Sequence, residues 1–273
     1  MKKTFILISA LCASALLYTS CSNNDDVVNK VDTTNISASV VIDALNETDV
    51  KNALTITNSN PTGKTSETPV ENCASITVTT PNGTDYPKVY TVDYGTGCTV
   101  NKITRKGKLK ITLTGSIIAT GSKMTIERID YYLNTHKLEG TIEYTNTTTV
   151  ATVPQWTRKV TNGKLTDVLN RVFSNSGTIT VRQTAGVDTP YVLEDNIYET
   201  PEGNHTVTSE KGGSLTITVQ ETLIKKYSCE YISKGKLKIE GGALNGVVDY
   251  GNNDCDNKYT YTHESGAIYN SQL

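Results

Sequence analysis

Residues 206–219 read TVTSEKGGSLTITV, and this stretch decides the fold class. Thr and Ser alternate with Val, Leu and Ile on both sides of a Lys-Gly-Gly connection. Alternation with period two is typical of a half-buried strand, and a Gly-rich connection between two such segments is typical of a β-hairpin. The stretch therefore predicts two antiparallel strands joined by a tight turn.

The same pattern extends over residues 71–273, which we interpret as one β domain. Further alternating segments occur at 75–79, 88–92, 109–113 and 178–181. Turn signals separate such segments roughly every 8 to 15 residues, as in all-β domains. The sequence thus predicts an all-β fold with an extended antiparallel sheet. A β-sandwich and an open barrel-like sheet both remain compatible with it.

The composition excludes some classes of partner. The chain has 273 residues, with 26 Lys and Arg against 28 Asp and Glu. Loss of Lys2 and Lys3 with an N-terminal signal leaves 24 basic residues, so the net charge becomes about −4. No basic face suggests a nucleic acid. The 15 Tyr and only two Phe fit pleated sheets with one wet face better than a helical core.

Residues 1–20 have the layout of a signal peptide. Two lysines precede an apolar stretch at 5–17, and Ser20-Cys21 ends the segment. A small residue directly before a cysteine is typical of bacterial lipoproteins, in which the cysteine becomes the acylated first residue. We therefore expect lipidation of Cys21, with several acyl chains holding the protein on a membrane. The alternative is an ordinary secretory signal.

Residues 22–26, SNNDD, resemble the acidic tag that follows the lipidated cysteine in surface-exposed lipoproteins of Bacteroidota-type bacteria. This resemblance implies an outer-membrane anchor with the protein displayed on the cell surface. A plain polar tether on a periplasm-facing protein is the alternative.

Residues 21–70 are expected to be a polar tether between the membrane and the β domain. The segment is rich in Thr, Asn and Ser, and 58–69 has the Pro and Gly of a linker. Apolar residues between 40 and 56 predict a short helix or a docking strand, and the sequence does not decide between them. Asp32-Thr33-Thr34 resembles an Asp-Thr-X acceptor signal, so Thr33 is a candidate for O-glycosylation.

Four cysteines remain once Cys12 leaves with the signal and Cys21 takes lipid. They are Cys73, Cys98, Cys229 and Cys255. The absence of any CxxC spacing and the oxidising compartment favour disulfides over a metal site. We expect Cys73–Cys98 and Cys229–Cys255, because each pair brackets one expected hairpin of similar length. Two other connectivities are formally open.

Two short segments recur near the two ends of the β domain. KGKLKI occurs at 106–111 and 234–239, and DYG occurs at 93–95 and 249–251. Because their order is reversed in the second half, we expect two similar disulfide-closed hairpins and not a tandem duplication. With the ending DYGNNDCDN, the chain resembles a family of uncharacterised Bacteroidota-type exported lipoproteins. The resemblance implies export, lipidation and an all-β domain, and it implies no activity.

Tyr131, Tyr132 and Trp156 are the candidate ligand contacts. Pro154 places Trp156 in or beside a loop, and exposed aromatic rings stack on sugars, so a glycan is one expected ligand. Filling of the core is the alternative for the same side chains.

Asp249, Asp254 and Asp256 are candidate calcium ligands. Residues 249–257 crowd carboxylate and amide oxygens, which Ca²⁺ prefers. Asp, Asn and Gly are also what tight turns require, and this second interpretation is favoured. We expect no other cofactor.

No catalytic motif is recognisable. The three histidines are scattered, and HExxH, P-loop and nucleophile-elbow patterns are absent. The sequence therefore predicts a lipid-anchored cell-envelope protein that is a non-catalytic binding or structural module, with a glycan or an envelope or host protein as its partner. The alternative is an envelope hydrolase acting on glycans through paired carboxylates, which only coordinates would reveal.

Overall fold

One long helix precedes a run of strands in the computed structural model, which describes residues 31–59, 73–81, 83–190 and 192–273. The helix is α1 (Thr34–Ser59), and a 3-10 turn, η1 (Gly242–Leu244), lies late in the chain. The strands are β1 (Ser75–Thr79), β2 (Lys88–Asp93), β3 (Cys98–Val100), β4 (Ile103–Leu113), β5 (Lys123–Leu133), β6 (His136–Asn146), β7 (Gln155–Thr166), β8 (Val172–Ala185), β9 (Ile197–Ser209), β10 (Ser214–Lys226), β11 (Lys234–Glu240), β12 (Gly246–Asn252), β13 (Lys258–His263) and β14 (Ile268–Gln272).

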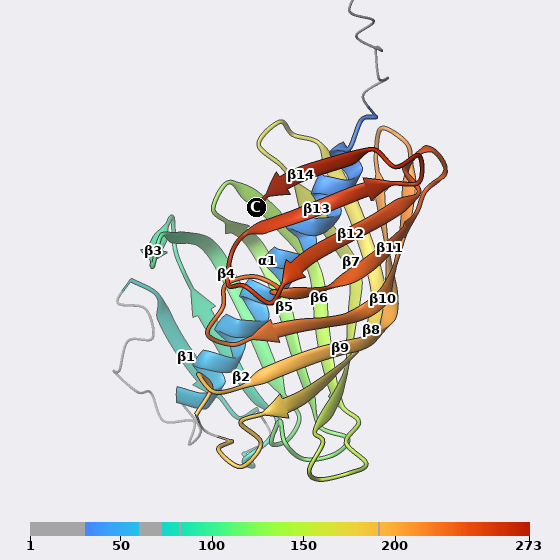
Figure 1. Cartoon of the computed structure of the whole chain (residues 1–273). Helices are drawn as coiled ribbons and strands as arrows, with labels where there is room; N and C mark the ends of the chain where they lie inside the picture. Colours follow the sequence, from blue (N-terminus) through green and yellow to red (C-terminus); the bar gives the residue numbers. More distant parts are fainter. Residues whose placement is uncertain (1–30, 60–72, 82, 191) are drawn as a thin grey trace, which may run out of the picture. The chain divides into compact units, whose positions relative to one another are not determined.

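All strands belong to one antiparallel sheet. Its order is β1-β2-β4-β5-β6-β7-β8-β9-β10-β11-β12-β13-β14, and the short β3 pairs with β4. The hairpin predicted from residues 206–219 is β9–β10, in which Val207 pairs with Leu215. The predicted antiparallel all-β fold is confirmed. The sheet is open, with β1 and β14 as its edges (Figure 1).

The helix α1 lies against the concave face of the curved sheet, within the unit formed by residues 32–273 (Figure 1). Every residue from 34 to 58 is buried or partly buried. Ile36, Ile42 and Ile56 belong to the same hydrophobic core as the strands. Our expectation of a polar tether with a short helix or docking strand differs from this structure for residues 34–59, because they form one long helix that packs into the core of the sheet. No helix in the described part of the chain is long and apolar enough to cross a membrane.

The sequence of α1 is a weak helix former. Ten of its 26 residues are Thr, Val or Ile, whose branched side chains lose freedom in a helix. Its apolar residues do not form a single stripe, which is why the helical period was hard to recognise. The carboxylate of Asp32 accepts a hydrogen bond from the backbone N–H of Thr34 at 2.9 Å and so caps the start. Burial on all sides holds the rest helical.

Both expected disulfides are present. Cys73 pairs with Cys98 and Cys229 pairs with Cys255, with Cα–Cα distances of 5.4 and 5.2 Å.

The KGKLKI repeat has a structural counterpart. Gly107 and Gly235 both lie at bulges, on β4 and β11, with φ of +80° and +110°. A Cβ at Gly107 would lie 2.0 Å from the carbonyl oxygen of Asp130 on β5, so only glycine fits there.

Candidate functional site

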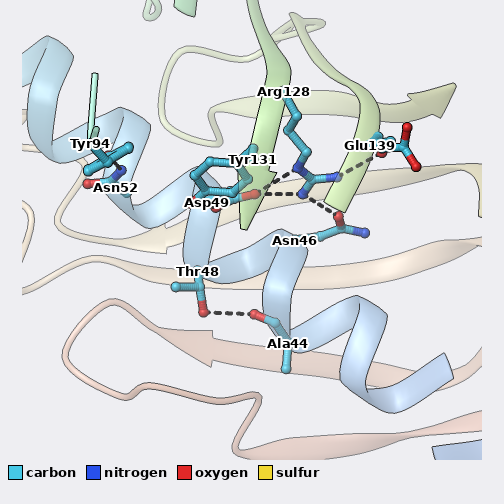
Figure 2. A network of polar contacts seen from close by, with 9 residues as sticks. All are labelled: Ala44, Asn46, Thr48, Asp49, Asn52, Tyr94, Arg128, Tyr131 and Glu139. Atoms are coloured by element: carbon cyan, nitrogen blue, oxygen red, sulfur yellow. Dashed lines mark hydrogen bonds and ion pairs between the residues drawn. The ribbon is translucent and has the colours of Figure 1, made fainter. Parts of the chain in front are cut away.

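A buried ion pair fixes α1 to β5 (Figure 2). Arg128 donates from Nε and Nη2 to Oδ2 of Asp49, at 2.8 and 2.7 Å, and from Nη2 to Asn46 at 2.8 Å. The hydroxyl of Tyr131 donates to the other carboxylate oxygen of Asp49 at 2.7 Å. The Arg128 and Asp49 side chains are only 1% and 0% exposed. Nearly all polar groups of this network therefore have hydrogen-bond partners inside the protein.

A bulge in β5 makes this network possible. Arg128 and Tyr131 are three residues apart, so in a regular strand they would face opposite sides of the sheet. The register with β6 shifts between Glu127 and Tyr131, the register with β4 shifts between Ile129 and Tyr132, and Asp130 has a φ of +45°. The shift turns both side chains toward α1, where they meet Asp49.

A neighbouring face of α1 lines a cavity. Asp43, Glu47, Val50, Lys51 and Leu54 all border it, at the spacing that places residues on one side of a helix. Asn46 and Asp49, which bind Arg128, lie beside this cavity face, because Asn46 is one turn away from both Asp43 and Val50.

The cavity has a volume of about 520 Å³ and an apolar wall. The sheet side is formed by inward-facing residues of five strands, namely Met124, Trp156, Ile179, Ile217 and Leu237. All five side chains are at least nine-tenths buried. Alternation along each strand directs these residues inward, so the apolar wall follows from the strand pattern itself.

A charged cluster sits at the junction of α1 with β7 and β9. Arg158 Nη1 donates to Glu47, and Nη2 lies 3.9 Å from the carboxylate of Asp43. His205 Nε2 lies 3.4 Å from the other oxygen of Asp43, without the geometry of a hydrogen bond. Burial lowers the pKa of His205; the Asp43 carboxylate opposes this shift and the Arg158 charge adds to it. His205 is therefore neutral at pH 7.

His205 should make the protein less stable in mild acid. The pKa of His205 is lower in the folded protein than in the unfolded chain, where it is about 6.5. As the pH falls below that value, the unfolded chain therefore binds a proton at His205 more readily than the folded protein does, and this favours unfolding. The free energy of unfolding should therefore fall as the pH drops below about 6.5, and His205→Gln should lose less over the same range. Denaturant titrations between pH 5 and 8 measure this.

The control is His263→Gln on β13, outside the cavity lining, which should keep the wild-type slope. Equal slopes for wild type and His205→Gln would contradict the assignment.

Three loops border the cavity: 114–122, 147–154 and the described residues of 186–196. The first loop is joined to the second and to β7, because Thr120 donates to the carbonyl of Thr148 at 3.1 Å and the indole of Trp156 donates to the carbonyl of Ile117 at 3.1 Å. Several of their apolar side chains face solvent, at 43% to 55% exposure: Ile118, Val150, Val153 and Val192. Ile118 also borders the cavity, so the apolar interior continues to the surface.

Lys225 borders the cavity from β10. Its side chain is buried, and Nζ donates to the carbonyl oxygens of Cys229 and Lys226. Burial lowers its pKa to about 8; the Glu47 carboxylate opposes the shift and the Lys51 ammonium adds to it. The disulfide-bonded Cys229 thus helps to hold the turn that receives this ammonium.

The predicted aromatic contacts do not form an exposed platform. Tyr131 is 0% exposed and bonds Asp49, so our expectation of exposure is wrong for it. It is also wrong for Trp156, which is 7% exposed, although this residue lines the cavity. Tyr132 faces the other side of β5, where Lys106 Nζ lies 5.1 Å from its ring centroid. Adjacent strand residues point to opposite faces, which separates the two tyrosines.

The candidate calcium ligands are not brought together. In the described ranges, no group of three or more His, Cys, Asp or Glu residues is arranged to hold a metal ion. Asp249 accepts from the N–H of Gly251 at 2.8 Å, and Asp256 accepts from the N–H of Lys258 at 3.0 Å. Asp254 lies in the turn between β12 and β13. The local bonds of Asp249 and Asp256 are those of turns.

The two candidate modification sites, Cys21 and Thr33, precede the helix in the sequence. Thr33 directly precedes α1 and is partly buried, and its carbonyl accepts from the N–H of Ser37. Cys21 lies outside the described residues.

Sequence reasoning missed the ionisable residues that border the cavity, namely Asp43, Glu47, Lys51, Arg158, His205 and Lys225. One signal was present: the two carboxylates are four residues apart, as on one helix face. This spacing could be interpreted only once the segment was known to be a helix. The partners of the two carboxylates, Arg158 on β7 and His205 on β9, lie more than 100 residues away in the sequence. Comparison of the chain with protein-family models, curated protein sequences and solved structures found no match.

Proposed function

We propose that the protein is a binding protein that holds an apolar or amphipathic small molecule in the cavity between α1 and the sheet. The observation that carries this proposal is the cavity itself. Its volume of about 520 Å³ lies in the usual range for small-molecule sites, roughly 300–1,000 Å³, and its apolar wall with a few polar groups has their usual character. Such a wall favours a ligand that gains by leaving water.

The arrangement favours an apolar ligand over a glycan. Sugar rings are bound by exposed aromatic faces together with many hydrogen-bonding groups. Here Trp156 is buried among aliphatic side chains of the cavity, and Tyr131 is committed to Asp49. The carboxylates Asp43 and Glu47, which a glycan hydrolase would need as acid and base, both face Arg158. A non-catalytic binding role accounts for these features more simply.

Blocking the cavity should weaken binding of a neutral apolar probe. Ile179 lines the cavity from β8, and in Ile179→Trp the larger ring takes the space of the ligand. We expect the affinity for N-phenyl-1-naphthylamine, measured by fluorescence titration, to fall about tenfold or more, equivalent to about 1.4 kcal/mol.

The matched control is Ile268→Trp on β14, a side chain that is 64% exposed and lies outside the cavity lining. It should bind the probe like the wild type. Circular dichroism of both variants checks that the sheet is intact. Absence of probe binding by the wild type, or equal affinity of the two tryptophan variants, would refute the proposal.

We further propose that the protein acts at the outer membrane, anchored through lipid on Cys21 and displayed on the cell surface. The support is the sequence: the signal-like residues 1–20, the Ser-Cys junction and the acidic SNNDD that follows. Protease treatment of intact cells should remove the domain, and Cys21→Ala should leave the membrane fraction. Survival of a membrane-bound domain through this treatment would place it on the periplasmic side instead.

A further inference from the structure

The cavity holds one buried cation that lacks an anionic partner. Lys225 is 9% exposed, and its ammonium has three N–H donors. Two of them meet the carbonyl oxygens of Cys229 and Lys226. Among the described residues, no carboxylate oxygen lies within 4.0 Å of its Nζ. A buried charge without a counter-charge is costly, so this position calls for an anion.

The cavity's own carboxylates are occupied elsewhere. Glu47 accepts from Arg158, and Asp43 lies between Arg158 and His205. Neither is paired with Lys225, although Glu47 is near enough for its charge to raise the pKa of that lysine.

A second lysine strengthens the positive potential at this place. Lys51 on α1 also borders the cavity, and its charge adds to the lowering of the pKa of Lys225. The carboxylate of Glu230 is 4.0 Å from Lys51, at the limit of an ion pair, and both side chains are partly exposed. The cavity lining thus carries three basic side chains, Lys51, Arg158 and Lys225, against two carboxylates, Asp43 and Glu47.

Resting on the proposed function, we infer that the ligand is an anionic amphiphile, an apolar chain that ends in a carboxylate, and that Lys225 is the counter-charge for its head group. The chain lies along the wall formed by Trp156, Ile179 and Ile217, and the carboxylate accepts the remaining N–H of Lys225. A charge-assisted hydrogen bond in a dry site is stronger than a neutral one, which gives the site a preference for the acid over an uncharged analogue. The lowered pKa of Lys225 is consistent with a site that is incomplete without an anion.

The test compares two ligands of equal chain length. Tetradecanoate and tetradecanol, below their aggregation limits at pH 7, compete with N-phenyl-1-naphthylamine for the full mature chain. In the wild type we expect the acid to compete at about a tenfold lower concentration than the alcohol or better. Lys225→Met should abolish this preference and leave competition by the alcohol unchanged.

Lys226→Met is the matched control, because the neighbouring Lys226 lies outside the cavity lining and donates to the carbonyl of Asn253. It should keep the wild-type preference. If Lys225→Met does not fold, Lys225→Gln replaces it, since its amide keeps a donor for the turn carbonyls. Equal competition by acid and alcohol in the wild type, or an unchanged preference in the Lys225 variant, overturns the inference and leaves the cavity function standing. Failure of the probe itself to bind refutes the proposed function, and the inference with it.

Discussion

A chain that lacks residues 32–59 is expected not to fold. Removal of α1 would expose the concave face of the sheet and the apolar side chains now packed on Ile36, Ile42 and Ile56. A fully buried Val or Ile contributes roughly 1.5–3 kcal/mol, and α1 buries five of them. The combined loss approaches the whole net stability of a typical protein, about 5–15 kcal/mol. Circular dichroism with denaturant titration should show no cooperative transition.

The control for this deletion is removal of β14, Ile268–Gln272, an edge strand that pairs only with β13. This shorter chain should still unfold cooperatively, at a lower denaturant concentration. If the chain without α1 unfolds cooperatively near the wild-type midpoint, the segment is the tether expected from the sequence and not part of the core.

Asp49→Ala should be the most damaging single substitution in α1. It leaves the guanidinium of Arg128 buried without its carboxylate and the hydroxyl of Tyr131 without its acceptor. Removing one partner of a buried ion pair typically costs about 3–5 kcal/mol. The double variant Asp49→Leu with Arg128→Met should recover much of that loss, because it removes both charges together. Unfolding free energies from denaturant titration measure each step.

Glu127, which precedes Arg128 on β5, supplies the control. Glu127 pairs with Lys110 at 3.0 Å, and both side chains are about 40% exposed. Glu127→Ala should therefore cost only about 0–1 kcal/mol. A loss for Asp49→Ala no larger than that for Glu127→Ala would show that the network in Figure 2 does not hold the helix in place.

These two predictions bear directly on the cavity. The hydrogen bonds that Arg128 donates to Asp49 and Asn46 fix the rotation of α1 about its axis. That rotation directs Asp43, Glu47 and Lys51 toward the cavity. A variant with a loosened helix should thus lose probe binding together with stability, whereas Ile179→Trp should lose binding alone.

The sequence by itself determined the all-β class and the disulfides. Alternation such as that of Leu215 to Val219 is a local consequence of one buried and one exposed sheet face, so it can be read without knowing the partner strand. The bridges Cys73–Cys98 and Cys229–Cys255 were also accessible, because each closes a segment of only 25 or 26 residues.

The tertiary structure alone decided the helix and the site. A segment as rich in Thr, Val and Ile as α1 has no strong local preference for a helix, and burial inside the sheet supplies the missing stabilisation. The bulge at Asp130 reverses the side to which Tyr131 points, and it requires the close approach of Gly107 from another strand, where a side chain would clash with the Asp130 carbonyl. The cavity likewise joins α1 to strands far along the chain, Arg158 and Lys225 among them. Such contacts depend on strand order and sheet curvature, which the alternation of neighbouring residues does not encode.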